Sequence, residues 1–219
     1  MSWLRPCFAT ITRGAWLKNN SSASFLPAKK SCRLGWWLPI FALVCLSGSN
    51  ALAVHAQAAE LEEYQVKAAF LFQFTKFIEW PAEAFSDANA PVTICLVGDD
   101  PFGFGLDELV KGKLINGRGL QVVRLKPGPG LRSCQMLFIS GSEKKRLMAI
   151  LENVKAAPVV TVSESDSFIH SGGVINFLLI NEQVRFDINL GATEGKGLKI
   201  SSRLLSVART VLRSQRGGG

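Results

Sequence analysis

The sequence predicts a single-domain α/β sandwich: a mostly parallel central sheet with helices on both faces and a C-terminal antiparallel hairpin. First, apolar runs of strand length alternate with segments of helical periodicity, the pattern of strands joined by crossover helices. Second, two neighbouring runs, residues 174–180 and 184–190, are separated by a short polar turn and indicate a hairpin. Third, the chain has 219 residues, 47% of them hydrophobic, which suits one domain plus a targeting segment.

Charge is distributed unevenly along the chain. Residues 1–56 carry six basic residues and no acidic one, so 19 basic and 17 acidic residues remain in residues 57–219. The formal net charge of +8 therefore falls to +2 beyond the first quarter. No basic patch with interleaved aromatics is evident there, and we expect no nucleic-acid partner.

The basic first quarter has the order of an export signal. An apolar run over residues 35–46 follows the basic stretch, and small residues then offer two cleavage sites, near Ala53 and Ala56. We therefore expect a signal peptide over residues 1–56, with a long basic N-terminal region, and a periplasmic domain over 57–219, ordered over about 60–213. The alternative is an uncleaved membrane anchor, for which the apolar run is short.

The first element of the domain is predicted to be a helix from Glu60 to Glu79, ended by Pro81. Lys67 projects into its apolar arc and must either snorkel to solvent or find a carboxylate, and we expect a structural ion pair. Phe72 projects into its polar face and is a candidate for partner binding. Trp80 at the helix end is a second candidate, although core packing is the role we expect for it. The apolar stripe repeats at steps of three and four residues: Val66, Phe70, Phe74 and Phe77.

The middle of the chain supplies the strands of the expected parallel sheet. Short helices are expected over residues 104–110 and 143–154, the second capped by Ser142. A Pro-Gly-Pro-Gly segment at 127–130 marks a loop. The expected strands cover residues 91–98, 120–125, 136–139 and 159–162.

A last helix is predicted over residues 198–212, followed by a disordered glycine tail at 217–219. One face of this helix is apolar and the other is basic. The basic face is either solvated or meets an acidic protein or anionic lipid, and it makes Arg203 and Arg209 candidates for partner binding. The basic face comprises Lys199, Arg203, Arg209 and Arg213.

Two cysteines, Cys95 and Cys134, remain once the expected signal is removed. An even pair in an oxidising compartment indicates one disulfide, here tying two core strands together. It would close a loop of about 39 residues and contribute about 3–4 kcal/mol in the chain-entropy model. The alternative is two buried free thiols.

No catalytic centre is recognisable, and we expect no enzyme, metal or cofactor. The loop at residues 98–105 follows a strand but lacks the G-x-G-x-x-G spacing of a phosphate cradle. The expected mature chain has one histidine, His170, and no nucleophile elbow. On the strand around 185–189, Arg185 and Asp187 share a polar face that either lines a ligand pocket with His170 or meets solvent.

Several segments, in order and spacing, resemble the YfiR family of periplasmic proteins. The likeness runs from about Glu60 to Arg213. It is carried by 64–71, 77–81, 94–103, 116–118, Cys134, 171–175, 185–189 and 201–208.

The resemblance implies a regulator that binds the periplasmic sensor part of an inner-membrane diguanylate cyclase and holds it inactive. It also implies an OmpA-like outer-membrane lipoprotein as a sequestering partner, a homodimer, and a core disulfide at Cys95 and Cys134. A second disulfide known in some relatives has no counterpart here. The competing hypothesis is a small-ligand-binding protein that serves a transporter or receptor, with a pocket at His170, Arg185 and Asp187.

Overall fold

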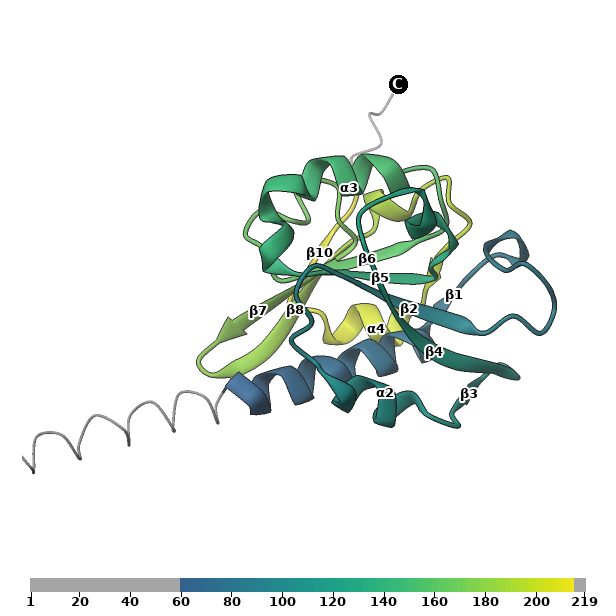
Figure 1. Cartoon of the computed structure of the whole chain (residues 1–219). Helices are drawn as coiled ribbons and strands as arrows, with labels where there is room; N and C mark the ends of the chain where they lie inside the picture. Colours follow the sequence, from purple (N-terminus) through teal and green to yellow (C-terminus); the bar gives the residue numbers. More distant parts are fainter. Residues whose placement is uncertain (1–59, 215–219) are drawn as a thin grey trace, which may run out of the picture. The chain divides into compact units, whose positions relative to one another are not determined.

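The computed structural model describes residues 60–214, and an eight-stranded sheet forms its centre (Figure 1). The expected signal peptide and the glycine tail lie outside the described residues. The strand order is β10-β8-β7-β6-β5-β2-β4-β3. The strands are β2 (Val92–Val97), β3 (Leu114–Ile115), β4 (Arg118–Leu125), β5 (Met136–Ile139), β6 (Val160–Ser163), β7 (Ile175–Ile180), β8 (Gln183–Asn189) and β10 (Thr210–Leu212).

Most neighbouring strands in this sheet are parallel. Every pair from β4 through β2, β5 and β6 to β7 is parallel, and β10 is parallel to β8. The β7–β8 hairpin and the short β3–β4 pair are antiparallel. The predicted fold class, including its antiparallel hairpin, is therefore confirmed.

Helices cover both faces of the sheet, as expected (Figure 1). One face carries α3 (Leu147–Val154), and the other carries the N-terminal helix (residues 60–77), α2 (Phe104–Val110) and α4 (Ser202–Val207). Four short 3-10 helices complete the connections: η1 (Ala82–Ala84), η2 (Pro129–Ser133), η3 (Gly141–Arg146) and η4 (Gly191–Thr193).

The central strands are apolar on both sides because each side meets a different core. Successive side chains of a strand point to opposite faces. On β5, Met136 and Phe138 join the core beneath the N-terminal helix, whereas Leu137 and Ile139 join the core beneath α3. All four are fully buried, which explains why these strands appear in the sequence as continuous apolar runs.

The C-terminal segment corrects the prediction of one helix over residues 198–212. The helix α4 has only six residues, and strands flank it on both sides. Before it, β9 (Lys199–Ile200) pairs with β1 (Ile78–Glu79) in a separate two-stranded sheet. After it, β10 extends the main sheet beside β8. The expected basic face therefore does not exist as a helix face.

Two other boundaries differ from the sequence prediction for local reasons. The N-terminal helix ends at residue 77, two residues early, because Ile78 and Glu79 join β1. The segment predicted as one helix over 143–154 begins as the 3-10 helix η3, and its capping side chain is Ser140 rather than Ser142. The Ser140 hydroxyl accepts a hydrogen bond from the Ser142 backbone N–H at 3.4 Å.

Candidate functional site

An open groove of about 790 Å³ lies between the N-terminal helix and the outer half of the β7–β8 hairpin. We call it the helix–hairpin groove. Its floor is apolar and is formed by Val66, Phe70, Leu179 and Val184. Its rim is polar and mostly acidic, formed by Glu60, Glu62, Glu63, Glu182, Gln183 and Arg185.

The groove exists because the hairpin extends beyond its neighbours in the sheet (Figure 1). The strand β6 pairs only with the first two residues of β7, and β10 pairs only with the last three residues of β8. The outer part of the hairpin, residues 178–185, is therefore paired only with itself. The N-terminal helix packs against one side of this outer part of the hairpin, but it does not cover that side fully near the tip.

Packing on the helix-facing side weakens toward the hairpin tip. Near the sheet, Phe177 and Phe186 lie opposite each other and pack against Phe70 and Phe74 of the helix, with ring centroids 5.0–6.2 Å apart. Two residues further out, the cross-strand pair is Leu179 and Val184. Leu179 is 53% exposed, so the apolar surface continues past the part that the helix covers.

The helix contributes the other exposed part of the floor. Val66 belongs to the predicted apolar stripe, and we expected it to be covered together with Phe74. The structure buries Phe74 completely but leaves Val66 44% exposed, because Val66 faces the groove. The apolar stripe of the N-terminal helix therefore extends beyond the core, and its first residue, Val66, contacts the groove instead.

A buried ion cluster fixes the helix beside the groove. The Lys67 side chain is 4% exposed, and its Nζ forms ion pairs with Glu63 of the same helix and with Glu164, 2.5 Å away, directly after β6. The Tyr64 hydroxyl donates a hydrogen bond to the other oxygen of Glu164 at 2.9 Å. The predicted carboxylate partner of Lys67 thus exists, and it ties the start of the helix to the sheet.

The Tyr64 phenol should titrate unusually late. Burial and the adjacent Glu164 carboxylate raise the pKa of Tyr64 above its ordinary value of 10.0. Above about pH 10 the unfolded chain loses this proton while the folded chain keeps it, so Tyr64 makes folding stability fall with rising pH. Tyr64 is the only tyrosine of the sequence, so tyrosinate absorbance reports it alone. We expect a higher midpoint in the native protein than in denaturant; equal midpoints would contradict the buried position.

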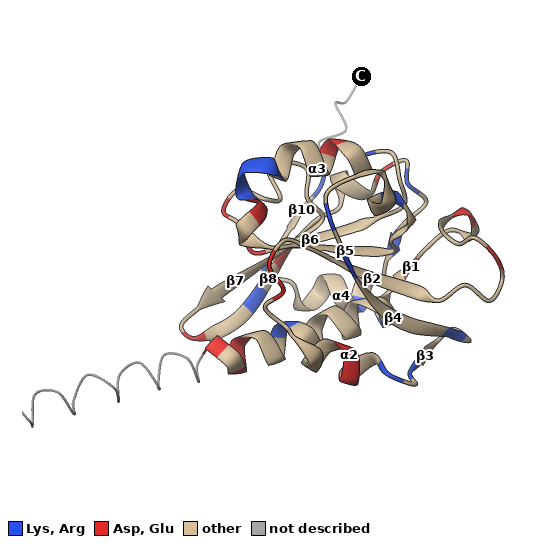
Figure 2. Ribbon diagram, in the orientation of Figure 1, with Lys and Arg blue, Asp and Glu red and all other residues tan. Residues whose placement is uncertain are grey.

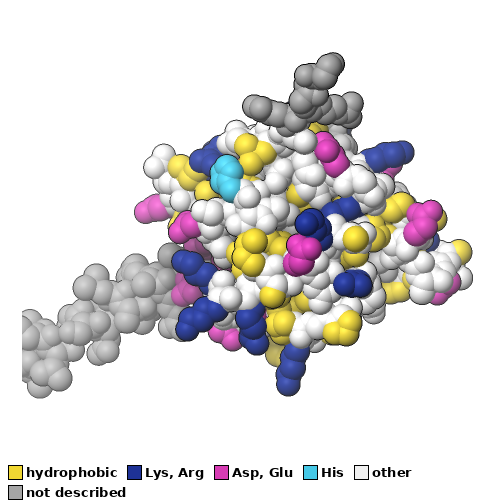
Figure 3. All heavy atoms as spheres, turned by 90° about the horizontal axis from the view of Figure 1, so that it is seen from above, with side chains coloured by type: hydrophobic (Ala, Val, Ile, Leu, Met, Phe, Trp, Pro, Cys, Tyr) yellow, Lys and Arg dark blue, Asp and Glu magenta, His cyan; other side chains and the backbone are white. Residues whose placement is uncertain are grey.

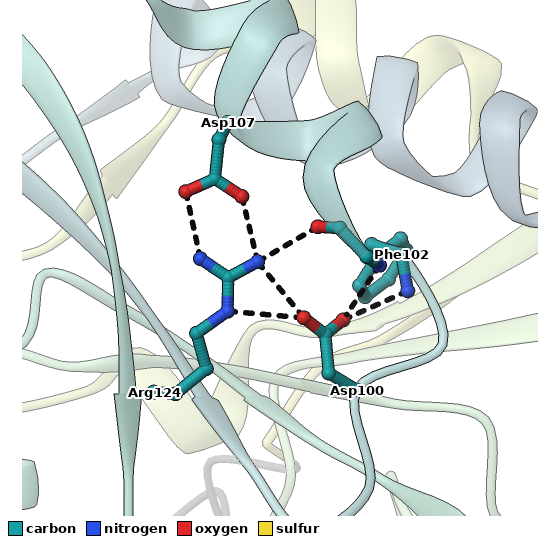
Figure 4. Close-up of polar contacts among 5 residues, drawn as sticks. Asp100, Phe102, Asp107 and Arg124 are labelled. Atoms are coloured by element: carbon teal, nitrogen blue, oxygen red, sulfur yellow. Dashed lines mark hydrogen bonds and ion pairs between the residues drawn. The ribbon is translucent and has the colours of Figure 1, made fainter.

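The loop after β2, which superficially resembled a phosphate cradle, is occupied by its own ion pairs (Figure 4). The guanidinium of Arg124 on β4 donates to Asp100 at 2.8 and 3.0 Å and to Asp107 of α2 at 2.6 and 2.7 Å. The second Asp100 oxygen accepts from the backbone N–H groups of Phe102 and Gly103. Hydrogen bonds from Arg124 lower the pKa of Asp107. These contacts give the loop a structural role.

The four residues predicted as partner-binding candidates lie outside the lining of the groove. Phe72 and Trp80 are half-buried and pack against the core, and the Trp80 indole N–H donates to the Gln135 carbonyl at 2.8 Å. Arg203 is exposed on α4. Arg209 forms a bidentate ion pair with Asp187, whose carboxylate raises the pKa of the guanidinium.

The three residues predicted to share a ligand pocket are separated in the structure. Asp187 is buried and is bound to Arg209. Arg185 lies at the rim of the helix–hairpin groove. His170 is exposed at the surface (Figure 3) and borders a different, shallow hollow with Asn189. Arg185 and His170 thus line different hollows, and Asp187 lines neither of these two.

The predicted cysteine pair is joined. A disulfide connects Cys95 of β2 to Cys134, two residues before β5, and both cysteines are buried in the core beneath α3. It crosslinks two adjacent strands of the parallel sheet.

None of the helices described within residues 60–214 is long and apolar enough to cross a bilayer. In the same range, no three His, Cys, Asp or Glu side chains are grouped as metal ligands would be.

The fold and the groove together define a single-domain α/β protein whose most developed surface feature is an open, acidic-rimmed apolar groove. The chain belongs to the YfiR/HmsC-like family, whose sequence model matches residues 64–209. No curated protein matches it significantly. Among solved structures, it is similar to a conserved domain protein from Vibrio cholerae, with a TM-score of 0.42 and 13% identity over 55% of this chain. The matched region spans about half of that structure, 54% of its length.

Proposed function

We propose that the exported chain is a periplasmic regulatory protein that represses an inner-membrane diguanylate cyclase by contact with its periplasmic sensor domain. Membership of the YfiR/HmsC-like family over residues 64–209 carries this proposal. The basic and apolar leader of the sequence supports export. In this role the protein acts by binding and not by catalysis, and an OmpA-like outer-membrane lipoprotein would relieve the repression by sequestering it.

The chemistry of the described surface supports a binding role. Five carboxylates of the described domain are engaged in ion pairs with Lys67, Arg124 or Arg209: Glu63, Glu164, Asp100, Asp107 and Asp187. The helix–hairpin groove is open and has exposed apolar side chains, which suits contact with another protein better than enclosure of a small molecule.

Deleting the gene should raise cellular cyclic-di-GMP and increase biofilm, because the cyclase loses its inhibitor. Complementation with the full-length gene should restore the low level. The matched control is the same gene without the codons for residues 2–56, whose product stays in the cytoplasm and should fail to complement. An unchanged cyclic-di-GMP level in the deletion strain would count against the proposed function.

A further inference from the structure

We propose that the helix–hairpin groove is the docking site for a cationic amphipathic segment of a partner protein, with apolar residues flanked by Lys and Arg. This inference rests on the proposed function, because it names the surface through which repression by contact acts. Three features of the groove point to this occupant: its exposed floor, the charge of its rim and the backbone at the hairpin turn.

The floor is an apolar surface without a cover in the described domain. Val66 is 44% and Leu179 is 53% exposed, and both continue apolar rows whose inner members are buried. Exposed apolar side chains that are grouped in a hollow, and not scattered, mark binding sites for other molecules. A segment that buries them must therefore present apolar side chains of its own.

The rim selects the charge of that segment. It carries four carboxylates and one guanidinium, a formal net charge of −3. Lys67 offsets Glu63 only in part, because its single charge is shared with Glu164. Figure 2 shows acidic residues on the first turns of the helix and at the nearby hairpin turn. Complementary charge steers an encounter and suppresses wrong partners, so the rim favours Lys and Arg on either side of the apolar contact.

The position of Glu182 is unfavourable for the fold. Asn181 and Glu182 form the two-residue hairpin turn with φ values of 49° and 61°. Such turns favour glycine at the second position, because a side chain is strained at positive φ. The chain thus keeps a carboxylate at the groove where the turn alone would favour glycine, which is explained if the carboxylate serves binding.

The same charges disfavour the other occupants. In a symmetric contact between two copies the same patch meets itself, so the acidic rims would repel each other. Anionic lipid and nucleic acid would be repelled as well.

Binding is tested with the mature chain and a labelled helical peptide that has leucines on one face and lysines on the other. A second peptide has glutamates in place of the lysines. We expect only the lysine peptide to bind, and to bind more weakly as salt is raised. The double variant Glu62→Gln/Glu182→Gly should bind it about threefold to tenfold more weakly, and Leu179→Ala about threefold more weakly.

Two controls separate binding from folding. Glu152→Gln removes a carboxylate that is also exposed, from α3 on the opposite face of the sheet, and should leave binding unchanged. The single variant Glu182→Gly relieves the strained turn, so it should melt at the same or a higher temperature while binding more weakly. Equal binding of both peptides, or unaltered binding by the double variant, would overturn the proposal. So would a dimer in gel filtration that Leu179→Ala dissociates, since a second copy would then occupy the groove.

Complementation in the deletion strain separates this inference from the proposed function. The double variant should fail to restore low cyclic-di-GMP, whereas Glu152→Gln should restore it. If the double variant restores it fully, the groove is not the docking site and the proposed function stands. If the wild-type gene has no effect either, the proposed function fails. The peptide measurements alone then show whether the groove binds a cationic amphipathic segment.

Discussion

Replacing Lys67 by methionine should lower the free energy of unfolding by about 3–5 kcal/mol, because it breaks a buried ion cluster from one side. Lys67 is 3% exposed and pairs with two carboxylates, Glu63 and Glu164, which are themselves only about 20% exposed. Without the ammonium, two desolvated negative charges face each other with no counter-ion. Methionine keeps the length and the apolar stem of lysine, so the loss reports the charge.

Urea unfolding followed by tryptophan fluorescence measures this loss, because Trp80 is the only tryptophan within residues 60–214. The matched control is Lys111→Met, which removes a lysine from a fully exposed i,i+3 pair with Glu108 and should cost less than about 1 kcal/mol. The double variant Lys67→Met/Glu164→Gln should regain part of the stability, since it removes one orphaned charge. If Lys67→Met is no more destabilising than Lys111→Met, the cluster does not hold the helix.

The same cluster connects stability to the proposed docking site. Lys67 lies one residue after Val66, and Glu63 belongs to the rim of the groove. A helix that is no longer tied to Glu164 would present the floor of the groove less rigidly. Binding of the lysine peptide by Lys67→Met, measured below its melting temperature, should therefore weaken even though no contact residue of the floor has changed.

The central sheet was predictable because its signals are local. A run such as residues 136–139 is apolar at every position, and this pattern is typical of a strand whose two faces are both buried. The hairpin was predictable for the same reason, since two apolar runs flank a turn of two residues. Lys67 on an apolar helix face likewise predicted a carboxylate partner, although not that the partner would be Glu164.

The C-terminal segment and the groove depend on distant residues. Residues 198–212 have the apolar spacing of a helix, but Thr210–Leu212 gain strand hydrogen bonds beside β8, and Asp187 holds Arg209 there. The groove depends on how many hairpin residues pair with β6 and β10, and no local sequence pattern predicts that number. The one available signal was Glu182 in a hairpin turn that favours glycine.

Removing the Cys95–Cys134 disulfide should cost about 4 kcal/mol of stability, because the bond closes a loop of 39 residues in the unfolded chain. The crosslinked loop contains α2, β3, β4 and η2, so four elements gain freedom in the unfolded state when the bond is absent. For a domain of this size the loss corresponds to a melting temperature lower by about 8–16 °C. Calorimetry of Cys95→Ala/Cys134→Ala measures it.

Reduced wild-type protein separates the crosslink from packing. Both cysteines are at most 2% exposed, so reduction requires refolding in the presence of reductant, and the reduced chain keeps the two buried sulfurs that the alanine variant lacks. We expect the reduced protein to lose most of the 4 kcal/mol or so and the alanine variant to lose slightly more, by the cavity that the missing sulfurs leave.

Loss of the disulfide should weaken repression in cells, because it lowers the stability of the regulator. The crosslink lies beneath α3, on the face of the sheet opposite the groove, so its loss should leave peptide binding intact in the fraction that remains folded. Cells that express the alanine variant should therefore contain less folded regulator and more cyclic-di-GMP, while the purified variant binds the lysine peptide normally at low temperature. Two free thiols in the mass spectrum of the exported protein would refute the crosslink. Weak peptide binding by the cold, folded variant would instead show that the disulfide shapes the groove itself.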